Sequence, residues 1–304
     1  MTLSTNDVNT APDIDEAVND DPAVQLPDQG SERTIWERVL IHGILAVASL
    51  IAIAPFVWAL GMTFQPLAEI SASPLNPVPQ NPTLDNYVTL WTDHPFDRWI
   101  INSLLLTVGA TFLALLFDSL AGFALAKGDF VGRDALFMLV IGTLVIPPQV
   151  ILVPLFLNMQ GIGWGNTYWA MMALWVAGPF GTFMMRQFFL SIPDSLIEAA
   201  RMDGCSLFDI YLRIALPMGK PALASLTIFL FIFVWGAFLW PLIIADSSAM
   251  FPLQVGIGLL TGPYTQDWGV LMAASVLAAA PVITAYLFAQ REFMEGIALT
   301  GGKG

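Results

Sequence analysis

Six long runs of apolar residues alternate with polar segments along this chain. A helix needs about 20 mostly apolar residues to cross the roughly 30 Å hydrocarbon core of a bilayer. The runs that reach this length cover residues 39–61, 99–125, 135–159, 167–185, 219–244 and 267–289. The pattern therefore predicts an all-α, polytopic membrane protein with six transmembrane helices.

The third of these runs contains three prolines, Pro147, Pro148 and Pro154. A proline inside a helix removes one backbone hydrogen bond, and its ring clashes with the preceding turn. Helices therefore kink or break at such positions. We expect residues 135–159 to form two shorter helical pieces with a break between them.

Composition agrees with a membrane protein. The 304 residues are 56% hydrophobic and only 12% charged, whereas soluble domains carry about 25% charged residues. The net charge of −13 is concentrated at one end, because residues 1–38 hold nine acidic residues against two arginines. This segment also has few large apolar residues, so we expect an acidic, disordered arm. Its length and acidity do not match a signal peptide.

The lysines and arginines predict the orientation, because cytoplasmic loops carry an excess of these residues. With the N-terminal arm in the cytoplasm, ten of the 11 basic residues fall on the cytoplasmic side and only Arg98 falls outside. We therefore expect both termini to be cytoplasmic. The domain organisation becomes an arm over 1–38, a membrane domain over 39–290 and a cytoplasmic tail over 291–304, with the polar stretch 193–217 also facing the cytoplasm.

Several kinds of chemistry lack their usual residues. Cys205 is the only cysteine, and the two histidines, His42 and His94, lie far apart. We therefore expect neither an internal disulfide nor a metal site. No GxxxxGK[ST] motif occurs, so the chain is not expected to hydrolyse nucleotide itself. A membrane-embedded enzyme would need a constellation of reactive side chains that is missing here.

The stretch "EAARMDGCSLFDIYLRIALP", residues 198–217, is unusually polar for its place between two apolar runs. Asp194 predicts a helix start, and Gly204 predicts a break, because glycine adopts the left-handed conformation that ends helices. A second helix is expected from Ser206 to Pro217. Its apolar residues recur at helical spacing and form one stripe: Leu207, Ile210, Tyr211 and Ile214.

Two readings of this helix pair remain open. An amphipathic connector that lies flat in the membrane interface would carry lysine and arginine along its polar face. Here that face is mixed, since it includes Glu198, Asp203 and Asp209. Mixed charge favours the second reading, in which a helical knob presents an apolar face to a partner protein.

At these residues the chain resembles a known family. "EAARMDG" followed by "IALP" is similar to the EAA loop of permease subunits in binding-protein-dependent ABC importers. "PTLDNYVTLW", "GAFLWPLI" and "QREFMEGIALTGGKG" resemble the carbohydrate-uptake branch and its MalG-like permease. The resemblance covers about residues 81–304 and implies the type I ABC importer permease fold.

In that family the loop docks into a groove on a cytoplasmic ATPase and transmits its closure to the spans. The resemblance implies this role for a set of eight residues here: Glu198, Ala199, Ala200, Asp203, Gly204, Leu207, Ile214 and Pro217. Asp203 and Gly204 would set the turn, and Pro217 would end the second helix.

The resemblance implies a non-catalytic permease in the cell inner membrane that imports a neutral sugar or oligosaccharide. Its partners would be a second permease, two ATP-binding cassette subunits, an extracytoplasmic solute-binding protein and membrane lipid, with no nucleic acid. The partner subunits would bind ATP and Mg, and this chain would hold no cofactor. The alternative is a secondary carrier or channel driven by an ion gradient, but such a carrier would carry several membrane-embedded ionisable groups.

Five residues within the spans are candidates for the substrate pathway. They are Asn102, Asp118, Trp235, Phe238 and Trp240. Sugar rings stack on aromatic faces, although aromatic residues in helix bundles also serve packing. Asp118 is the one acidic residue inside a span, and an acid in that position is costly unless it faces other helices or water. An interhelical hydrogen bond and a pathway role are both open for Asp118.

Overall fold

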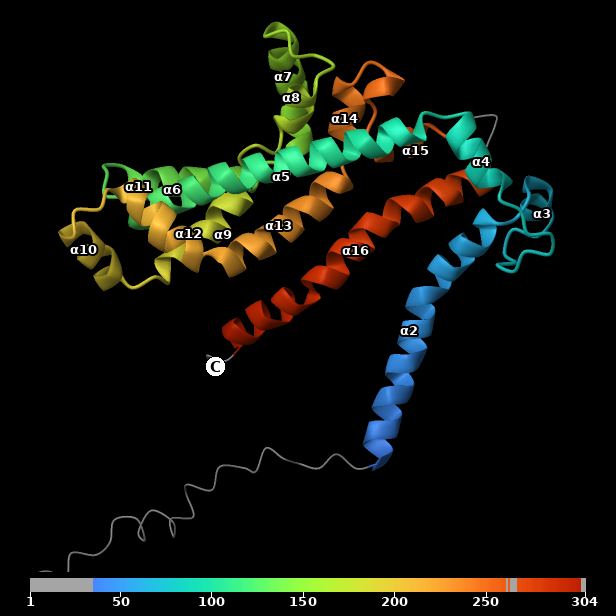
Figure 1. Cartoon of the computed structure of the whole chain (residues 1–304), viewed down its shortest axis with the longest axis horizontal. Helices are drawn as coiled ribbons and strands as arrows, with labels where there is room; N and C mark the ends of the chain where they lie inside the picture. The colour runs from blue at the N-terminus through green and yellow to red at the C-terminus, as the bar shows by residue number, and fades with distance from the viewer. Residues whose placement is uncertain (1–34, 261, 263–266, 302–304) are drawn as a thin grey trace, which may run out of the picture. The chain divides into compact units, whose positions relative to one another are not determined.

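The computed structural model describes residues 35–260, 262 and 267–301, with side chains described up to residue 287. All regular structure within these residues is helical. The chain divides at Pro55 into two compact units, Met1–Pro55 and Phe56–Gly304. The predicted arm lies outside the described residues up to residue 34, and its last four residues, 35–38, already belong to a helix. The helices are labelled in Figure 1.

The longer helices supply the candidate membrane spans. They are α2 (Ile35–Thr63), α5 (Phe96–Lys127), α6 (Arg133–Thr143), α7 (Pro148–Gly161), α9 (Pro179–Leu190), α13 (Lys220–Trp235) and α16 (Trp268–Gly301). Short helices connect them: α3 (Leu67–Ala72), α4 (Asp85–Thr92), α8 (Tyr168–Met172), α14 (Leu239–Ile244), the 3₁₀ turn Ser248–Met250 and α15 (Leu253–Leu259).

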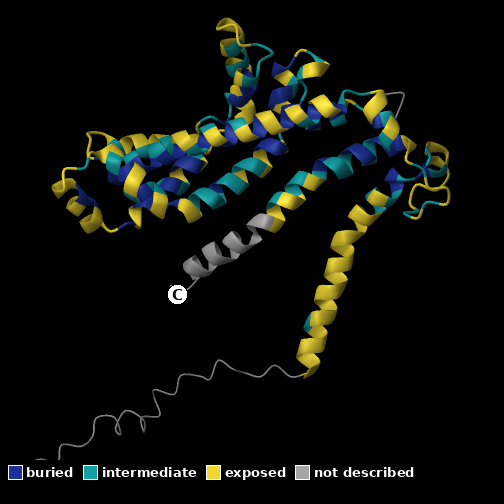
Figure 2. Cartoon of the chain, viewed as in Figure 1, coloured by how far each residue is buried: buried dark blue, intermediate teal, exposed yellow. Residues whose placement is uncertain are grey.

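The part of α2 that belongs to the first unit runs from Ile35 to Pro55, and almost all of its residues are exposed (Figure 2). Large apolar side chains such as Leu50 and Ile51 are 69% and 70% exposed. A helix that is apolar on every side needs an apolar surrounding. The surface of this part of α2 therefore suits contact with lipid or with another chain.

In the second unit, α5 is the central helix and packs along α9 and α13 (Figure 1). Close approach to α9 depends on Gly122. A Cβ atom at that position would stand 2.7 Å from Met185 Cβ and 2.8 Å from the backbone nitrogen of Arg186. Helices in membranes associate through such small residues because lipid provides no hydrophobic drive. One apolar cluster then joins α5 and α9 to α13 through Phe123, Phe189 and Leu226.

The predicted spans are confirmed in part. By length and composition, Ile35–Thr63, Phe96–Lys127 and Trp268–Leu287 are each long and apolar enough to cross a membrane. The third predicted run consists of α6 and α7, which are bent by 102° at the prolines, as expected. Up to five such spans exist among the described residues if each bent helix pair is one span.

The fourth and fifth runs were wrongly predicted as single helices. Residues 167–185 form α8 and the start of α9, with residues 173–178 between the two helices. Residues 219–244 form α13 and α14, with an interruption at Gly236. The fifth run is broken at Gly236, and glycine loses the most backbone entropy when it becomes helical. In the fourth run α8 ends at Met172, and the chain becomes helical again at Pro179, whose fixed φ suits the first position of a helix but not its interior.

Candidate functional site

Residues 193–217 form a helix–turn–helix, as predicted. The first helix, α10, covers Asp194–Met202, and the backbone then turns at Gly204, whose φ is 82°. The Gly204 N–H donates to the Arg201 carbonyl and the Cys205 N–H to the Ala200 carbonyl, both at 3.0 Å. This pair of bonds is the Schellman arrangement, which satisfies the last carbonyls of a helix and requires a left-handed residue at its turn.

The second helix is less regular than predicted. It comprises α11 (Leu207–Ile210), a π-helical turn (Tyr211–Ala215) and α12 (Leu216–Met218). Pro217 lies inside α12 and does not end the helix. The wide π turn leaves some carbonyls without their usual i→i+4 partner, so the missing N–H of Pro217 costs little there. The chain bends by 77° between this helix and α13.

A capping box starts this second helix at Ser206. The Ser206 hydroxyl accepts from the Asp209 N–H at 3.1 Å, and the Asp209 carboxylate accepts from the Ser206 N–H at 3.2 Å. The Asp209 carboxylate also accepts from the Ser206 hydroxyl at 2.5 Å. This bond, then the one from the Ser206 N–H and a smaller contribution from Arg213, hold the pKa of Asp209 below its usual value. Asp209 also forms an i,i+4 ion pair with Arg213 at 3.7 Å. It is exposed, and such pairs contribute only a few tenths of a kcal/mol.

The apolar stripe of the second helix faces mostly inward, which contradicts the expectation of an exposed stripe. Ile210 and Tyr211 are buried and Ile214 is half-buried, in a cluster with Phe123 and Phe189. The stripe therefore attaches the second helix to its own chain. Only Leu207, at 38% exposed, lies on the surface.

A different set of apolar side chains covers the outside of the segment. Met202, Phe208 and Leu212 are 88%, 60% and 44% exposed. Phe208 and Leu212 are four residues apart and so share one face of the helix. That spacing was the only sequence signal for this surface. It was missed because the neighbouring stripe has a more regular helical spacing and was predicted to be the exposed face.

The residues that the family resemblance singled out divide between surface and core. Exposed are Glu198, Ala199, Asp203, Gly204, Leu207 and Pro217, whereas Ala200 is buried and Ile214 is half-buried. A Cβ atom at Gly204 would meet no atom within 4 Å, so the turn itself is uncovered. The exposed members lie on α10, on the turn and on the second helix.

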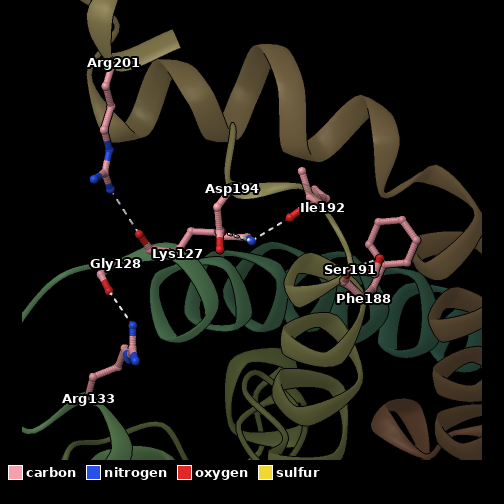
Figure 3. Close-up of polar contacts among 8 residues, drawn as sticks. All are labelled: Lys127, Gly128, Arg133, Phe188, Ser191, Ile192, Asp194 and Arg201. Carbon is pink, nitrogen blue, oxygen red and sulfur yellow. Dashed lines mark hydrogen bonds and ion pairs between the residues drawn. The ribbon is translucent and has the colours of Figure 1, made fainter. Parts of the chain in front are cut away.

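A group of polar contacts joins α10 to the end of α5 (Figure 3). The Lys127 ammonium, on the last residue of α5, donates to the Ile192 carbonyl at 2.7 Å and to the Asp194 carboxylate at 2.6 Å. Arg201 donates to the Lys127 carbonyl at 3.2 Å. The Lys127 side chain is 5% exposed, and its hydrogen bond and charge lower the pKa of Asp194. Sequence reasoning used Lys127 only to predict orientation and missed these contacts.

Tyr211 makes a second connection between the segment and α5. Its hydroxyl lies 2.7 Å from the Ser119 hydroxyl, and both side chains are buried. Ser119 lies eight residues before Lys127, which corresponds to about 12 Å along the helix. The two attachments therefore fasten different ends of the 193–217 segment to the same helix.

Asp118 lies at the break in the fourth predicted span. Its Oδ1 accepts from the Gly178 N–H at 2.9 Å and from the Thr182 hydroxyl at 3.0 Å. Gly178 precedes the first residue of α9, so the carboxylate stands at the positive end of that helix. Of the two roles left open for Asp118, the structure contains the interhelical hydrogen bonds.

The other pathway candidates occupy separate places. The Asn102 amide donates to the carbonyls of Ala249 and Phe251 and accepts from Tyr168. The indole N–H of Trp240 donates to the carbonyls of Ala170 and Met171, so Asn102 and Trp240 both hold α8.

The remaining two aromatic candidates differ in exposure. Trp235 is buried, and its indole donates to the Ala278 carbonyl at 3.0 Å. Phe238 is 40% exposed. Of the three aromatic candidates, Phe238 alone is exposed, since Trp235 and Trp240 are buried. Among the described residues, no three His, Cys, Asp or Glu side chains come together as metal ligands would.

Comparisons with known proteins extend these observations. Residues 118–293 match a family model described as "Binding-protein-dependent transport system inner membrane component". The chain is 35% identical to the arabinooligosaccharides transport system permease protein of Halalkalibacterium halodurans, over 85% of this chain and 94% of that one. It is 32% identical to the diacetylchitobiose uptake system permease protein of Streptomyces coelicolor, over 82% and 84%.

A solved structure is similar as well. The chain superimposes on a bacterial ABC transporter involved in the import of the acidic polysaccharide alginate. The TM-score is 0.74 and the sequence identity is 25%, with 85% of this chain and 98% of that chain covered. The likeness therefore extends over nearly the whole of that chain.

Proposed function

Because this chain belongs to the family of binding-protein-dependent transport system inner membrane components, we propose that it is a non-catalytic permease subunit of an ATP-driven importer. It works with a second permease, two ATPase subunits and an extracytoplasmic binding protein. The ATPase subunits bind ATP and Mg, and this chain supplies half of the pathway. Its place is the inner membrane, with the 193–217 segment on the cytoplasmic side.

The surface of the 193–217 segment is the observation that carries the coupling role. Met202 and Phe208 expose apolar area beside the small, uncovered turn at Gly204. Such a surface fits a helix-in-groove contact, in which an apolar helix face lies in a groove and small residues allow close approach. Glu198 and Asp203 at its edge add charge that a basic rim on the ATPase would complement.

The proposed substrate is a neutral oligosaccharide. Relatives at 35% and 32% identity have names that refer to arabinooligosaccharides and diacetylchitobiose. The predicted topology leaves only Arg98 outside the cytoplasm, so the outer surface has little positive charge for an acidic sugar such as alginate. The exposed Phe238 offers an aromatic face on which a sugar could stack.

Reconstitution in nanodiscs tests this function. The four membrane and ATPase subunits would be combined with binding protein loaded with arabinooligosaccharide, chitobiose, alginate oligosaccharide or glycerol phosphate. We expect a neutral oligosaccharide to stimulate ATP hydrolysis most. Stronger stimulation by alginate oligosaccharide or glycerol phosphate would overturn the proposed substrate class.

The alternative of a secondary carrier or channel makes the opposite prediction for the chain alone. A carrier would transport sugar under an ion gradient without ATPase subunits. We expect the purified single chain to be inert in liposomes, with and without a proton gradient. Uptake by the single chain would refute the permease assignment.

A further inference from the structure

Lys127 places a charged ammonium where water has little access. Its side chain is 5% exposed, and within hydrogen-bond distance it has the Ile192 carbonyl and the Asp194 carboxylate. A buried ammonium is costly unless it is paired and hydrogen-bonded. The last residue of α5 is therefore tied to the two acceptors that it needs, and both belong to the entry of α10.

The same residue holds the other end of α10 through its backbone. Arg201, in the last turn of α10, donates to the Lys127 carbonyl. Asp194 and Arg201 are seven residues apart, or about 10 Å along the helix. Lys127 thus contacts α10 near both of its ends, which opposes tilting of α10 relative to α5 (Figure 3).

The helix that Lys127 ends, α5, is well placed to pass a displacement of α10 on to other membrane helices. α5 packs along both α9 and α13. A force applied to α10 would therefore reach the spans through α5, provided that α10 and α5 move together.

We propose that Lys127 is a positioning residue that fixes α10 to the end of α5, so that motion of the docking helix is delivered to the membrane helices. The inference rests on the proposed coupling role of the 193–217 segment. It adds a residue outside that segment, and it assigns α5 as the helix that receives the motion.

The geometric part is tested without any partner. In a Cys205→Ser background, spin labels at Ser195→Cys and Val131→Cys would report the distance between α10 and the loop after α5 in the full chain in nanodiscs. We expect Lys127→Met to broaden the distance distribution and Lys127→Arg to keep it narrow. Lys220→Met is the matched control, because Lys220 is exposed and lies at the start of α13. An unchanged distribution in Lys127→Met would overturn the proposal.

The functional part uses the assembled complex. We expect Lys127→Met to assemble and keep basal ATP hydrolysis. Its sugar-stimulated hydrolysis should fall roughly tenfold or more, as for loss of a charge-assisted hydrogen bond. Lys127→Arg should restore it. Asp194→Ala, which leaves the Ile192 carbonyl to Lys127, should give a smaller loss and keeps the test available if Lys127→Met does not fold.

The two levels of inference fail differently. If the wild-type complex shows no sugar-stimulated hydrolysis, the proposed function fails, while the distance measurement still decides whether Lys127 holds α10. If Lys127→Met broadens the distances but leaves stimulation at the wild-type level, the positioning role is overturned and the proposed function stands.

Discussion

Gly204 provides the sharpest test of the coupling segment. Its φ of 82° lies in the left-handed region, and its N–H closes the turn that ends α10. A residue with a side chain costs about 1–2 kcal/mol in this conformation. No atom lies within 4 Å of a Cβ atom at this position, so within the chain the backbone is the only source of strain.

Three substitutions separate backbone strain from contact with a partner. Gly204→Asn has a smaller backbone cost than Gly204→Ala, because asparagine tolerates the left-handed region. Its side chain is nevertheless larger than that of alanine. Gly204→Val combines a β-branched side chain with the highest backbone cost.

The assay is sugar-stimulated ATP hydrolysis by the reconstituted complex, with membrane insertion and melting temperature measured in parallel. An alanine cost of 1–2 kcal/mol lowers the ratio of intact to opened turn by about 5- to 30-fold. We expect Gly204→Val to insert but to lose stimulation, and Gly204→Asn to lose more than Gly204→Ala if the turn contacts the ATPase. Normal stimulation in Gly204→Val would refute the reasoning.

Four further predictions concern α5 and its neighbours. Asp118→Ala should lower stability by about 2–4 kcal/mol, measured by thermal unfolding in detergent, because two hydrogen bonds are lost and one donor, the Thr182 hydroxyl, stays buried. Gly122→Leu should cost about 1–3 kcal/mol in the same measurement, because the helix approach has no room. Tyr211→Phe should cost about 1 kcal/mol through the lost bond to Ser119. The Asp194 carboxyl has a lowered pKa in the folded chain, so its stabilising effect is complete above its ordinary value of 3.8 and is lost as pH falls through the lower folded value.

Matched variants control these measurements. Asp118→Asn keeps an acceptor oxygen and should lose less than Asp118→Ala. Gly142→Leu adds the same side chain where no atom lies within 4 Å of a new Cβ atom, and Tyr286→Phe removes an exposed hydroxyl. For Asp194→Ala, the loss in melting temperature should be constant between about pH 5 and 8. If a variant and its control lowered stability equally, the contact proposed for that variant would be contradicted. A melting-temperature loss in Asp194→Ala that changes between about pH 5 and 8 would contradict the explanation from the Asp194 pKa.

The spans were predictable to the extent that they are single helices. The bounds of α5 and α2 lie within a few residues of the predicted runs, because a long apolar run in lipid must satisfy its backbone internally. Hydropathy does not register a break whose residues are themselves small or apolar, and for this reason Gly178–Pro179 and Gly236 were overlooked.

The coupling segment shows a similar division. The turn at Gly204 follows from local conformation and was predicted correctly. The direction of the stripe around Tyr211 was predicted wrongly. The same amphipathic helix sequence allows the stripe to pack against its own chain or against a partner protein. Lys127 and Asp194 are 67 residues apart in the chain, so no local pattern reveals their pairing.

The break before α9 has a consequence for how this permease and its relatives can diverge. Asp118 bonds to Gly178, and a Cβ atom at Gly181 would collide with the same carboxyl group. The acid and Gly181 therefore form a unit that evolution must exchange together, whereas position 178 contributes only its backbone N–H. We expect relatives with an uninterrupted helix at this level to lack the acid as well, and those that keep it to retain a glycine at the position of Gly181.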